Sequence, residues 1–311
     1  MKRKIYTIGE TVYDIIFEHG EIKAGKAGGS MLNASVSLGR CGCDISFISE
    51  VGDDDPGKLI LNFLKKNGVD ISFVHSFSDG KTPLALAFLD ENKNAKYSFY
   101  KAYPKQRLQQ AFPQIRENDI VLFGSFFAIN PEVRSRVLSF VRQAKNSGAI
   151  IVYDPNIRHP RNHNLKEVVN SVIENFSLAD IVRASNEDFE ALFDVNNPED
   201  AAEILKDNSE AVLIYTNSSR YVFLASAKEY RYYSVPEINV LSTIGAGDNF
   251  NAGLIYGLTK SALLKKDLTN IDEASWNKLI VYGIQFSQQV CKSYENYIPV
   301  DFTKRMQLPK Y

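Results

Sequence analysis

Short runs of apolar residues recur along the chain, and each is bounded by polar residues, glycine or proline. Runs of this length are typical of strands that are covered on both faces of a sheet. We expect strands at IYTIG (5–9), ISFISEV (45–51), IVLFG (120–124), AIIVY (149–153), DIVRA (180–184) and AVLIY (211–215).

Segments with a helical period lie between most of these runs. In residues 131–146, apolar positions recur on one helical face, namely Val133, Val137, Phe140, Val141 and Ala144. Another helix is expected to start at Asp55 and Pro56, with the aspartate as N-cap and the proline at the first helical position. Strands that alternate with helices predict a three-layer α/β fold, with a mostly parallel sheet between two layers of helices.

Two regions depart from this alternation. TVYDIIFEHGEIKAG (11–25) and PLALAFLDENKNAKYSFYKAYP (83–104) alternate apolar and polar residues on either side of turn-forming tips, as hairpins do. We expect them to form a small antiparallel sheet that projects from the main one. No linker or repeat is visible, so residues 1–311 are expected to form one domain.

The charge and composition of the chain exclude several classes of partner. With 36 Lys and Arg against 37 Asp and Glu, the net charge of −1 favours neither nucleic acid nor an anionic membrane. No apolar run approaches the ~18 residues of a membrane helix, and MKRKIYTIGE contains no signal-peptide core. The three cysteines form no CxxC pair and are expected to be reduced. These features predict a cytoplasmic protein with a small-molecule partner.

Two glycine-containing stretches match part of a nucleotide-binding motif but lack residues that the motif needs. Gly52-Asp-Asp-Asp-Pro-Gly57-Lys58 satisfies GxxxxGK, but Leu59 follows where the Mg²⁺-binding hydroxyl would be, and three carboxylates would line the loop. The stretch from Gly245 to Phe250 lacks the third glycine of a dinucleotide fingerprint. We expect neither a P-loop nor an NAD site.

The stretch LSTIGAGDNFNAG (241–253) carries the strongest chemical signal. Gly245, Ala246, Gly247 and Asp248 open an apolar helix, so free backbone N–H groups and the positive end of the helix dipole point at one place. A carboxylate beside such an anion hole suits proton abstraction from a hydroxyl while backbone donors hold the developing negative charge. Phosphoryl transfer needs both elements. Alternatively, Asp248 is only a helix cap.

Four co-linear stretches carry a resemblance to a known family. STIGAGDNFNAG resembles the C-terminal signature DTxGAGDxFxAG of the ribokinase-like (PfkB) carbohydrate kinases, and AGGSMLNASVSLGRCG (27–42) with ISEVGDDDPGKLILNFLKKNGVD (48–70) resembles their N-terminal signature. GETVYD (9–14) and DPNIRHP (154–160) resemble segments of the fructokinase branch. The resemblance implies a ribokinase-like fold, with the regions 11–25 and 83–104 as a β lid over the sugar and as the contact of a homodimer.

The resemblance also implies an ATP- and Mg²⁺-dependent kinase, most similar to a fructokinase, and a set of site residues. Asp248 is the expected base, and Gly245, Ala246 and Gly247 are the expected anion hole. The expected substrate-binding residues are Asp14, Gly28, Gly29 and Asn33, with Asn156 and Arg158 nearer the phosphates. The expected nucleotide-binding residues are Thr216, Ser218, Thr243, Gly245 and Gly247, and Asp188 is expected to hold Mg²⁺ through water.

The chain departs from the family pattern at four places. Ser242 replaces an Asp that helps some relatives to bind a monovalent cation, which leaves potassium dependence open. TNSSRY (216–221) places Ser218 and Tyr221 where the nucleotide loop usually has glycines. Glu295 and Asn296 replace a Gly-Ala pair, and ASNEDFEALF (184–193) fits the NxxE element only with Ser185 and Asp188 in its two positions, or with Asn186 and no Glu three residues later.

Other functions remain open from the residues alone. A 2-keto-3-deoxygluconate, ribose or nucleoside kinase would have the same fold and the same base. A sugar-binding pseudokinase is suggested by the altered TNSSRY loop, although a pure binding protein has no use for Asp248.

Overall fold

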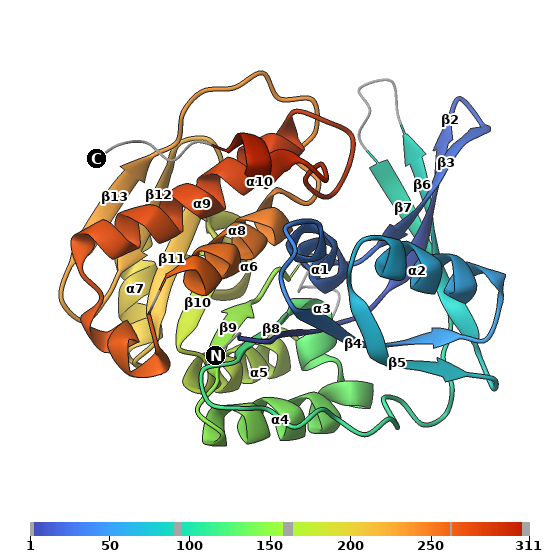
Figure 1. Cartoon of the computed structure of the whole chain (residues 1–311), viewed down its shortest axis with the longest axis horizontal. Helices are drawn as coiled ribbons and strands as arrows, with labels where there is room; N and C mark the ends of the chain where they lie inside the picture. Colours follow the sequence, from blue (N-terminus) through green and yellow to red (C-terminus); the bar gives the residue numbers. More distant parts are fainter. Residues whose placement is uncertain (1–2, 90–94, 158–163, 262, 307–311) are drawn as a thin grey trace.

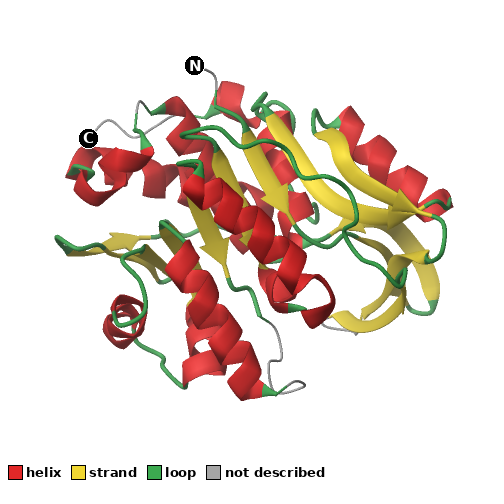
Figure 2. Cartoon of the chain, turned by 90° about the horizontal axis from the view of Figure 1, so that it is seen from below, coloured by secondary structure: helices red, strands yellow, loops and turns green. Residues whose placement is uncertain are grey.

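Helices cover both faces of a central sheet (Figures 1 and 2). The computed structural model describes residues 3–89, 95–157, 164–261 and 263–306, and within them the main sheet has nine strands. These are β1 (Ile5–Ile8), β4 (Ile45–Gly52), β5 (Asp70–Phe77), β8 (Ile120–Gly124), β9 (Ile150–Asp154), β10 (Ile181–Ser185), β11 (Val212–Asn217), β12 (Tyr221–Ala225) and β13 (Tyr230–Ser234). Every predicted strand is present.

The strand order is β13-β12-β11-β10-β9-β8-β1-β4-β5. The strands from β11 to β5 are parallel, and β12 and β13 add an antiparallel edge. The prediction of a mostly parallel sheet is therefore confirmed. From β1 the chain builds outward through β4 and β5 and then returns to start the other half at β8, so β1 and β8 flank a switch point. In open α/β sheets, ligands bind beyond the carboxyl ends of the strands near such a point.

Alternation along the strands divides the core into two layers. Ile5, Phe47 and Leu122 face one layer of helices, whereas Tyr6, Ile48 and Phe123 face the other. The first layer contains α1 (Ser30–Arg40), α2 (Asp55–Lys66), α8 (Ala246–Lys260) and α9 (Glu273–Cys291). The second contains α3 (Ser125–Ile129), α4 (Pro131–Asn146), α5 (Leu165–Leu178), α6 (Asn186–Phe193) and α7 (Pro198–Lys206). The remaining helical segments are short, η2 (Lys265–Asn270) and α10 (Phe302–Arg305).

The start of α2 differs by one residue from the prediction. The N-cap is Asp54, and Asp55 already belongs to the helix. The Asp54 carboxylate accepts hydrogen bonds from the Gly57 amide at 3.0 Å and from both the amide and the hydroxyl of Thr82. One of these donors lies in the loop and the other two belong to Thr82 on a neighbouring strand, so the GxxxxGK stretch is built around a carboxylate and not around a phosphate.

The two predicted hairpins form a small sheet that projects beside β4 and β5 (Figure 1). Its strands are β2 (Val12–Glu18), β3 (Glu21–Gly28), β6 (Lys81–Leu89) and β7 (Ala95–Ala102), in the order β3-β2-β6-β7. Each hairpin is antiparallel as expected, but the pair that joins them, β2 and β6, is parallel. The tip of the second hairpin, 90–94, lies outside the described residues. No helix in the described part of the chain combines the length and apolar content needed to cross a membrane.

Candidate active site

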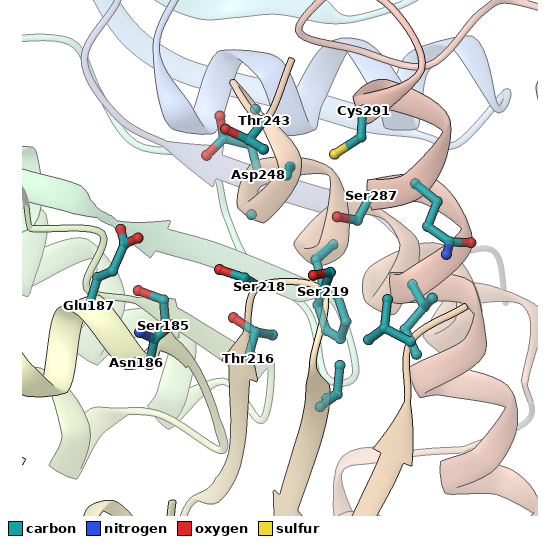
Figure 3. A pocket seen from close by; sticks show the side chains of 18 of the residues that line it. Ser185, Asn186, Glu187, Thr216, Ser218, Ser219, Thr243, Asp248, Ser287 and Cys291 are labelled. Carbon is teal, nitrogen blue, oxygen red and sulfur yellow. The ribbon is translucent and has the colours of Figure 1, made fainter. Parts of the chain in front are cut away.

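A cavity of about 940 Å³ opens at the carboxyl ends of β9, β10 and β11. Figure 3 shows Thr216 and Ser218 from β11 and its following turn, and Ser185, Asn186 and Glu187 from the start of α6, around the cavity, with Thr243 and Asp248 on the side of α8. Apolar side chains that include Val222, Val235, Ile244 and Ile284 also line it. The cavity lies at the carboxyl ends of the strands, the side of an open α/β sheet that binds ligands, and it is centred on β9, β10 and β11 rather than on the switch point between β1 and β8.

The first turn of α8 forms one wall of this cavity. Gly245 is its N-cap at φ 78°, and a Cβ there would come within 2.9 Å of the Asn296 carbonyl oxygen. Both the backbone conformation and the lack of space therefore favour glycine at this position. The Ala246 amide donates to the Thr243 carbonyl at 3.1 Å. It is therefore occupied, in contrast to the expectation that Gly245, Ala246 and Gly247 would all offer free donors.

Asp248 does not cap its own helix. The N-cap of α8 has no side-chain hydrogen bond, and the Asp248 carboxylate points instead toward α1. It accepts hydrogen bonds from Ser30 Oγ at 2.6 Å, Asn33 Nδ2 at 2.8 Å and Asn156 Nδ2 at 3.4 Å. With only 7% of its surface exposed, the carboxylate is fixed in one orientation by donors from two other elements.

Asn249, the next residue, ties α8 to the C-terminal segment. Its Nδ2 donates to the carbonyls of Gly245 and Asn296, both at 2.8 Å, and its Oδ1 accepts from the Ser37 hydroxyl of α1. Glu295 meanwhile forms an ion pair with Lys26 of β3 at 3.0 Å. The Glu295-Asn296 departure thus supplies contacts to both the small sheet and the glycine turn.

Asp14 and the Gly28-Gly29 pair lie where the small sheet joins α1. A Cβ on Gly28 would come within 2.2 Å of Asp14 Oδ2, and Gly29, at φ 128°, would bring one within 2.4 Å of the Glu10 carbonyl. Burial raises the pKa of Asp14 to about 7, and nearby Lys26 opposes that shift. A carboxyl with this pKa changes charge near neutral pH.

The altered nucleotide loop keeps the backbone shape that a glycine would have. Ser218 has φ 46°, in the left-handed region, and the Arg220 amide donates to the Asn217 carbonyl at 2.8 Å to close the turn. Thr216, Ser218 and Thr243, the expected nucleotide-binding residues, all line the cavity. The serine therefore alters the side chain in the turn and leaves the turn in place.

Asp188 has a structural role at the start of α6. It forms a capping box with Ser185, in which the Asp188 amide donates to Ser185 Oγ at 3.2 Å and Asp188 Oδ2 accepts from the Ser185 amide at 2.8 Å. Its Oδ1 accepts from the Ile157 amide at 2.9 Å. Of the two possible registers, this pairing corresponds to the one with Ser185 and Asp188 in the NxxE positions. No group of three or more potential metal-ligating His, Cys, Asp or Glu is present among the described residues.

A buried polar network lies below the first turn of α8. Arg183 of β10 donates to Asp154 Oδ2 at 3.1 Å and to Thr216 Oγ1 at 2.6 Å, and Asn251 Nδ2 reaches the same oxygen of Asp154 at 2.5 Å. Burial raises the pKa of Asp154, and the Arg183 guanidinium opposes that shift. Sequence reasoning did not single out this network.

Comparison with known proteins decides the family. The family profile described as pfkB family carbohydrate kinase matches residues 2–301. This chain belongs to the pfkB family of carbohydrate kinases. It is a phosphotransferase that acts on a sugar or a nucleoside, and the suspected family resemblance is confirmed.

Relatives of this kinase have several substrates in their names. Aminoimidazole riboside kinase of Salmonella typhimurium is 25% identical over 274 residues, which cover 86% of each chain, and a fructokinase of Escherichia coli is 24% identical over 269 residues, covering 85% of this chain and 87% of its own. The structure of Salmonella enterica aminoimidazole riboside kinase with aminoimidazole riboside and an ATP analogue has a TM-score of 0.84 at 22% identity, covering 97% of this chain and 98% of its own. A double mutant of Vibrio cholerae fructokinase, bound to fructose, ADP and potassium, has a TM-score of 0.82 at 20% identity, with 96% and 95% covered. These structures confirm the predicted three-layer fold.

The structure of this pfkB kinase brings most of the predicted residues together. Asp248, Asn33 and Asn156 are in contact, and the glycine turn lies beside them. Arg158 lies outside the described residues. Ser30 and Asn249 were missed, although both belong to the quoted signatures and their polar character within an apolar helix was a usable signal. Arg183 could also have been noticed from the sequence, since it is the one basic residue in the run DIVRA.

Proposed function

We propose that this kinase transfers the γ-phosphoryl group of ATP to a sugar hydroxyl, with Asp248 as the general base. The observation that carries the proposal is the buried Asp248 carboxylate, fixed by Ser30, Asn33 and Asn156 beside the glycine turn of α8. A carboxylate held this way can accept the hydroxyl proton without first reorienting, and the amides of Gly245 and Gly247 stabilise the transferring group. Its alternative role as a helix cap is not supported by the contacts of α8.

Two carboxylates at the start of α6 suit a magnesium ion that accompanies the nucleotide. Mg²⁺ usually keeps several waters and is held by one or two carboxylates together with substrate phosphates. Glu187 and Asp188 both line the cavity, and the hydrogen bonds that Asp188 already accepts are compatible with contact through water. When bound, the ion would neutralise phosphate charge.

The acceptor that we propose is fructose or a similar hexose. This proposal rests on the GETVYD and DPNIRHP segments and on the number of fructokinases among the relatives. In it, Asp14, Gly28, Gly29 and Asn33 hold the sugar, and the small sheet is its lid. Asn33 already donates to Asp248, and its Oδ1 has no partner within the described structure, so that atom remains available for a hydroxyl.

An aromatic riboside is the second candidate acceptor. Asp14 pairs with Ala85, and Ala85 pairs with Phe99, so these residues share one face of the small sheet. Phe99 is 59% exposed and stacks on Tyr97 with ring centroids 5.8 Å apart. Such a surface suits a flat ring attached to the sugar, and an aminoimidazole riboside kinase is among the relatives.

A coupled assay with ATP and a panel of acceptors tests the proposed function. The panel contains fructose, ribose, 2-keto-3-deoxygluconate and aminoimidazole riboside, and ADP formation is measured for each. We expect fructose to give the highest kcat/KM. If the riboside is preferred, Phe99→Ala should reduce kcat/KM for it more than for ribose. A wild-type enzyme that forms no ADP above background with any acceptor would indicate a binding protein.

We also propose that activity does not require potassium. Ser242 offers a neutral hydroxyl where some relatives have a carboxylate, and its Oγ accepts from the Ile244 amide at 3.2 Å. Hard cations favour oxygen ligands with charge compensation. At constant ionic strength, exchange of K⁺ for a bulky ammonium ion should leave the rate within about twofold, because only general screening is involved. Saturable activation by K⁺ would show that backbone carbonyls are enough to bind the ion.

The second face of the small sheet is our proposed homodimer contact. Phe17, Ile22, Phe88 and Tyr100 lie on the face opposite Asp14, and the last three are 43–67% exposed. A patch of this kind on a projecting sheet favours a protein partner. Sedimentation of the wild type and of Phe88→Lys should show dimer and monomer, respectively, and a monomeric wild type at assay concentration would contradict the proposal.

A further inference from the structure

The charge balance of the cavity is the starting point. Among the described residues that line it, Arg183 is the only Lys, Arg or His, whereas the carboxylates number four: Glu187, Asp188, Glu237 and Asp248. A nucleotide brings further negative charge into this space. Beyond any metal ion, the described lining offers one side chain that can oppose it.

Arg183 is held in a fixed position by buried partners. It is 8% exposed, in the middle of β10, and its guanidinium bridges Asp154 and Thr216 at 3.1 and 2.6 Å. Its Nε and Asp154 Oδ1 have no hydrogen-bond partner among the described residues. The ion pair therefore does not use all the hydrogen-bonding capacity of either group.

The guanidinium lies directly against the first turn of α8. A Cβ built on Gly247 would be 2.6 Å from Arg183 Nη1 and 3.1 Å from both Cζ and Nη2. This position puts a positive side chain beside the positive end of the helix dipole, where an anion between the two would be stabilised by both. The φ of Gly247 lies outside the left-handed range, so its backbone conformation does not require glycine. The closeness of the Arg183 guanidinium does, because a Cβ would collide with it.

We propose that Arg183 contacts the phosphates of the nucleotide donor and stabilises the leaving group during transfer. In that step the bond from the γ-phosphorus to the β,γ-bridging oxygen breaks, and its electron pair stays on that oxygen of ADP. The sugar oxygen forms the new bond to phosphorus, and its proton goes to Asp248. Arg183 offers donors in a planar fork that suits phosphate oxygens, while Asp154 and Thr216 are positioning residues.

Binding of ADP and of adenosine separates this role from a structural one. Both ligands contain the same nucleoside, but only ADP carries phosphates. Arg183→Gln should weaken ADP binding about tenfold or more by calorimetry and leave adenosine binding within about twofold, because a charge-assisted phosphate contact is lost. Arg183→Lys should recover part of the ADP affinity. Arg142→Gln, an exposed arginine of α4, is the matched control and should change neither.

The double variant Arg183→Gln with Asp154→Asn removes both charges of the buried pair and keeps the test valid if the single variant unfolds. It should show the same selective loss of ADP affinity. Equal weakening of ADP and adenosine, or unchanged ADP binding, would overturn the proposal and make Arg183 a structural partner of Asp154. The inference rests on the proposed function, but different experiments would contradict the inference and the proposed function. Absence of turnover with every acceptor contradicts the kinase proposal, whereas the ADP and adenosine comparison requires no turnover.

Discussion

The Asp14 carboxyl illustrates how one half-buried side chain can make ligand binding depend on pH. Its pKa is raised to about 7 by burial, so the protonated form dominates below that pH in the free protein. In the unfolded chain the group ionises near 3.8, so its contribution to the free energy of unfolding decreases as pH rises from about 4 to about 7.

A sugar hydroxyl that donates to Asp14 favours the ionised form. We therefore predict that sugar affinity rises with pH up to about 7, by at most about tenfold per pH unit, and is level above it. Calorimetry at pH 6 in two buffers with different ionisation enthalpies should show proton release on sugar binding. Asp14→Asn is the control and should bind without proton release. Proton uptake by the wild type would contradict the assignment.

Ser218 is a second residue with a measurable consequence. An L side chain at φ 46° is strained, and glycine there avoids contact between Cβ and the backbone. Ser218→Gly should raise the free energy of unfolding by about 0.5–1 kcal/mol in urea denaturation. Ser219→Gly, in the same turn but without a positive φ, is the matched control and should lower it. Equal effects of the two changes would show that the turn is unstrained.

At the residue scale, the sequence identified Asp248 as the candidate base but did not identify the side chains that donate hydrogen bonds to it. Ser30 and Asp248 are separated by 218 positions, and Asn33 and Asp248 by 215. The two signatures lie near opposite ends of the chain, and neither of them shows that the two meet in the folded protein. For the same reason, the expectation of a free Ala246 amide was wrong, because the partner carbonyl of Thr243 depends on how the turn closes.

At the element scale, α8 packs closely against α9. A Cβ on Gly253 would come within 2.3 Å of the Tyr282 carbonyl oxygen, and a Cβ on Gly283 within 2.7 Å of the Phe250 ring. Small residues at these positions let the two helices approach closely. The first turn of α8 carries Asp248, so the position of the proposed base depends on this contact.

Gly253→Ala should force the two helices apart. We predict a loss of about 1–3 kcal/mol in the free energy of unfolding, together with reduced kcat, since overpacking against backbone cannot be relieved by a side-chain rotation. Urea denaturation and steady-state kinetics measure the two effects. Lys278→Ala, on an exposed position of α9, is the control and should change stability by less than about 0.5 kcal/mol. A stable, fully active Gly253→Ala would contradict the role of this contact.

Elements with a strong apolar pattern were predictable, and edge strands were not. The expected runs became β1, β4, β8, β9, β10 and β11, all with largely buried residues. β5, β12 and β13 were missed. β5 and β13 lie at the edges of the main sheet and are mostly half-buried or exposed, whereas β12 lies inside the sheet and its buried run YVFLA was a usable signal. An edge strand has one bonded neighbour and needs no continuous apolar run.

At the scale of the whole molecule, the site is assembled from both halves of the sheet. α1 follows the first hairpin and supplies Ser30 and Asn33, β9 is followed by Asn156, and α8 supplies Asp248. The switch between β1 and β8 brings these segments to one end of the sheet (Figure 1). Alternation of strands and helices predicted the layers. It did not predict the strand order, because tertiary pairing decides that order and the local pattern does not.

The rate of phosphoryl transfer by the Asp248→Asn variant tests most directly the central claim, that Asp248 is the general base. The substitution keeps the shape of the side chain and removes its ability to accept the hydroxyl proton. With the best acceptor from the panel, kcat should fall by roughly 10²–10⁴-fold in the coupled assay, while calorimetric affinities for sugar and ADP stay within about threefold. A variant that binds both ligands and retains a kcat near that of the wild type would contradict the assignment of Asp248 as the base.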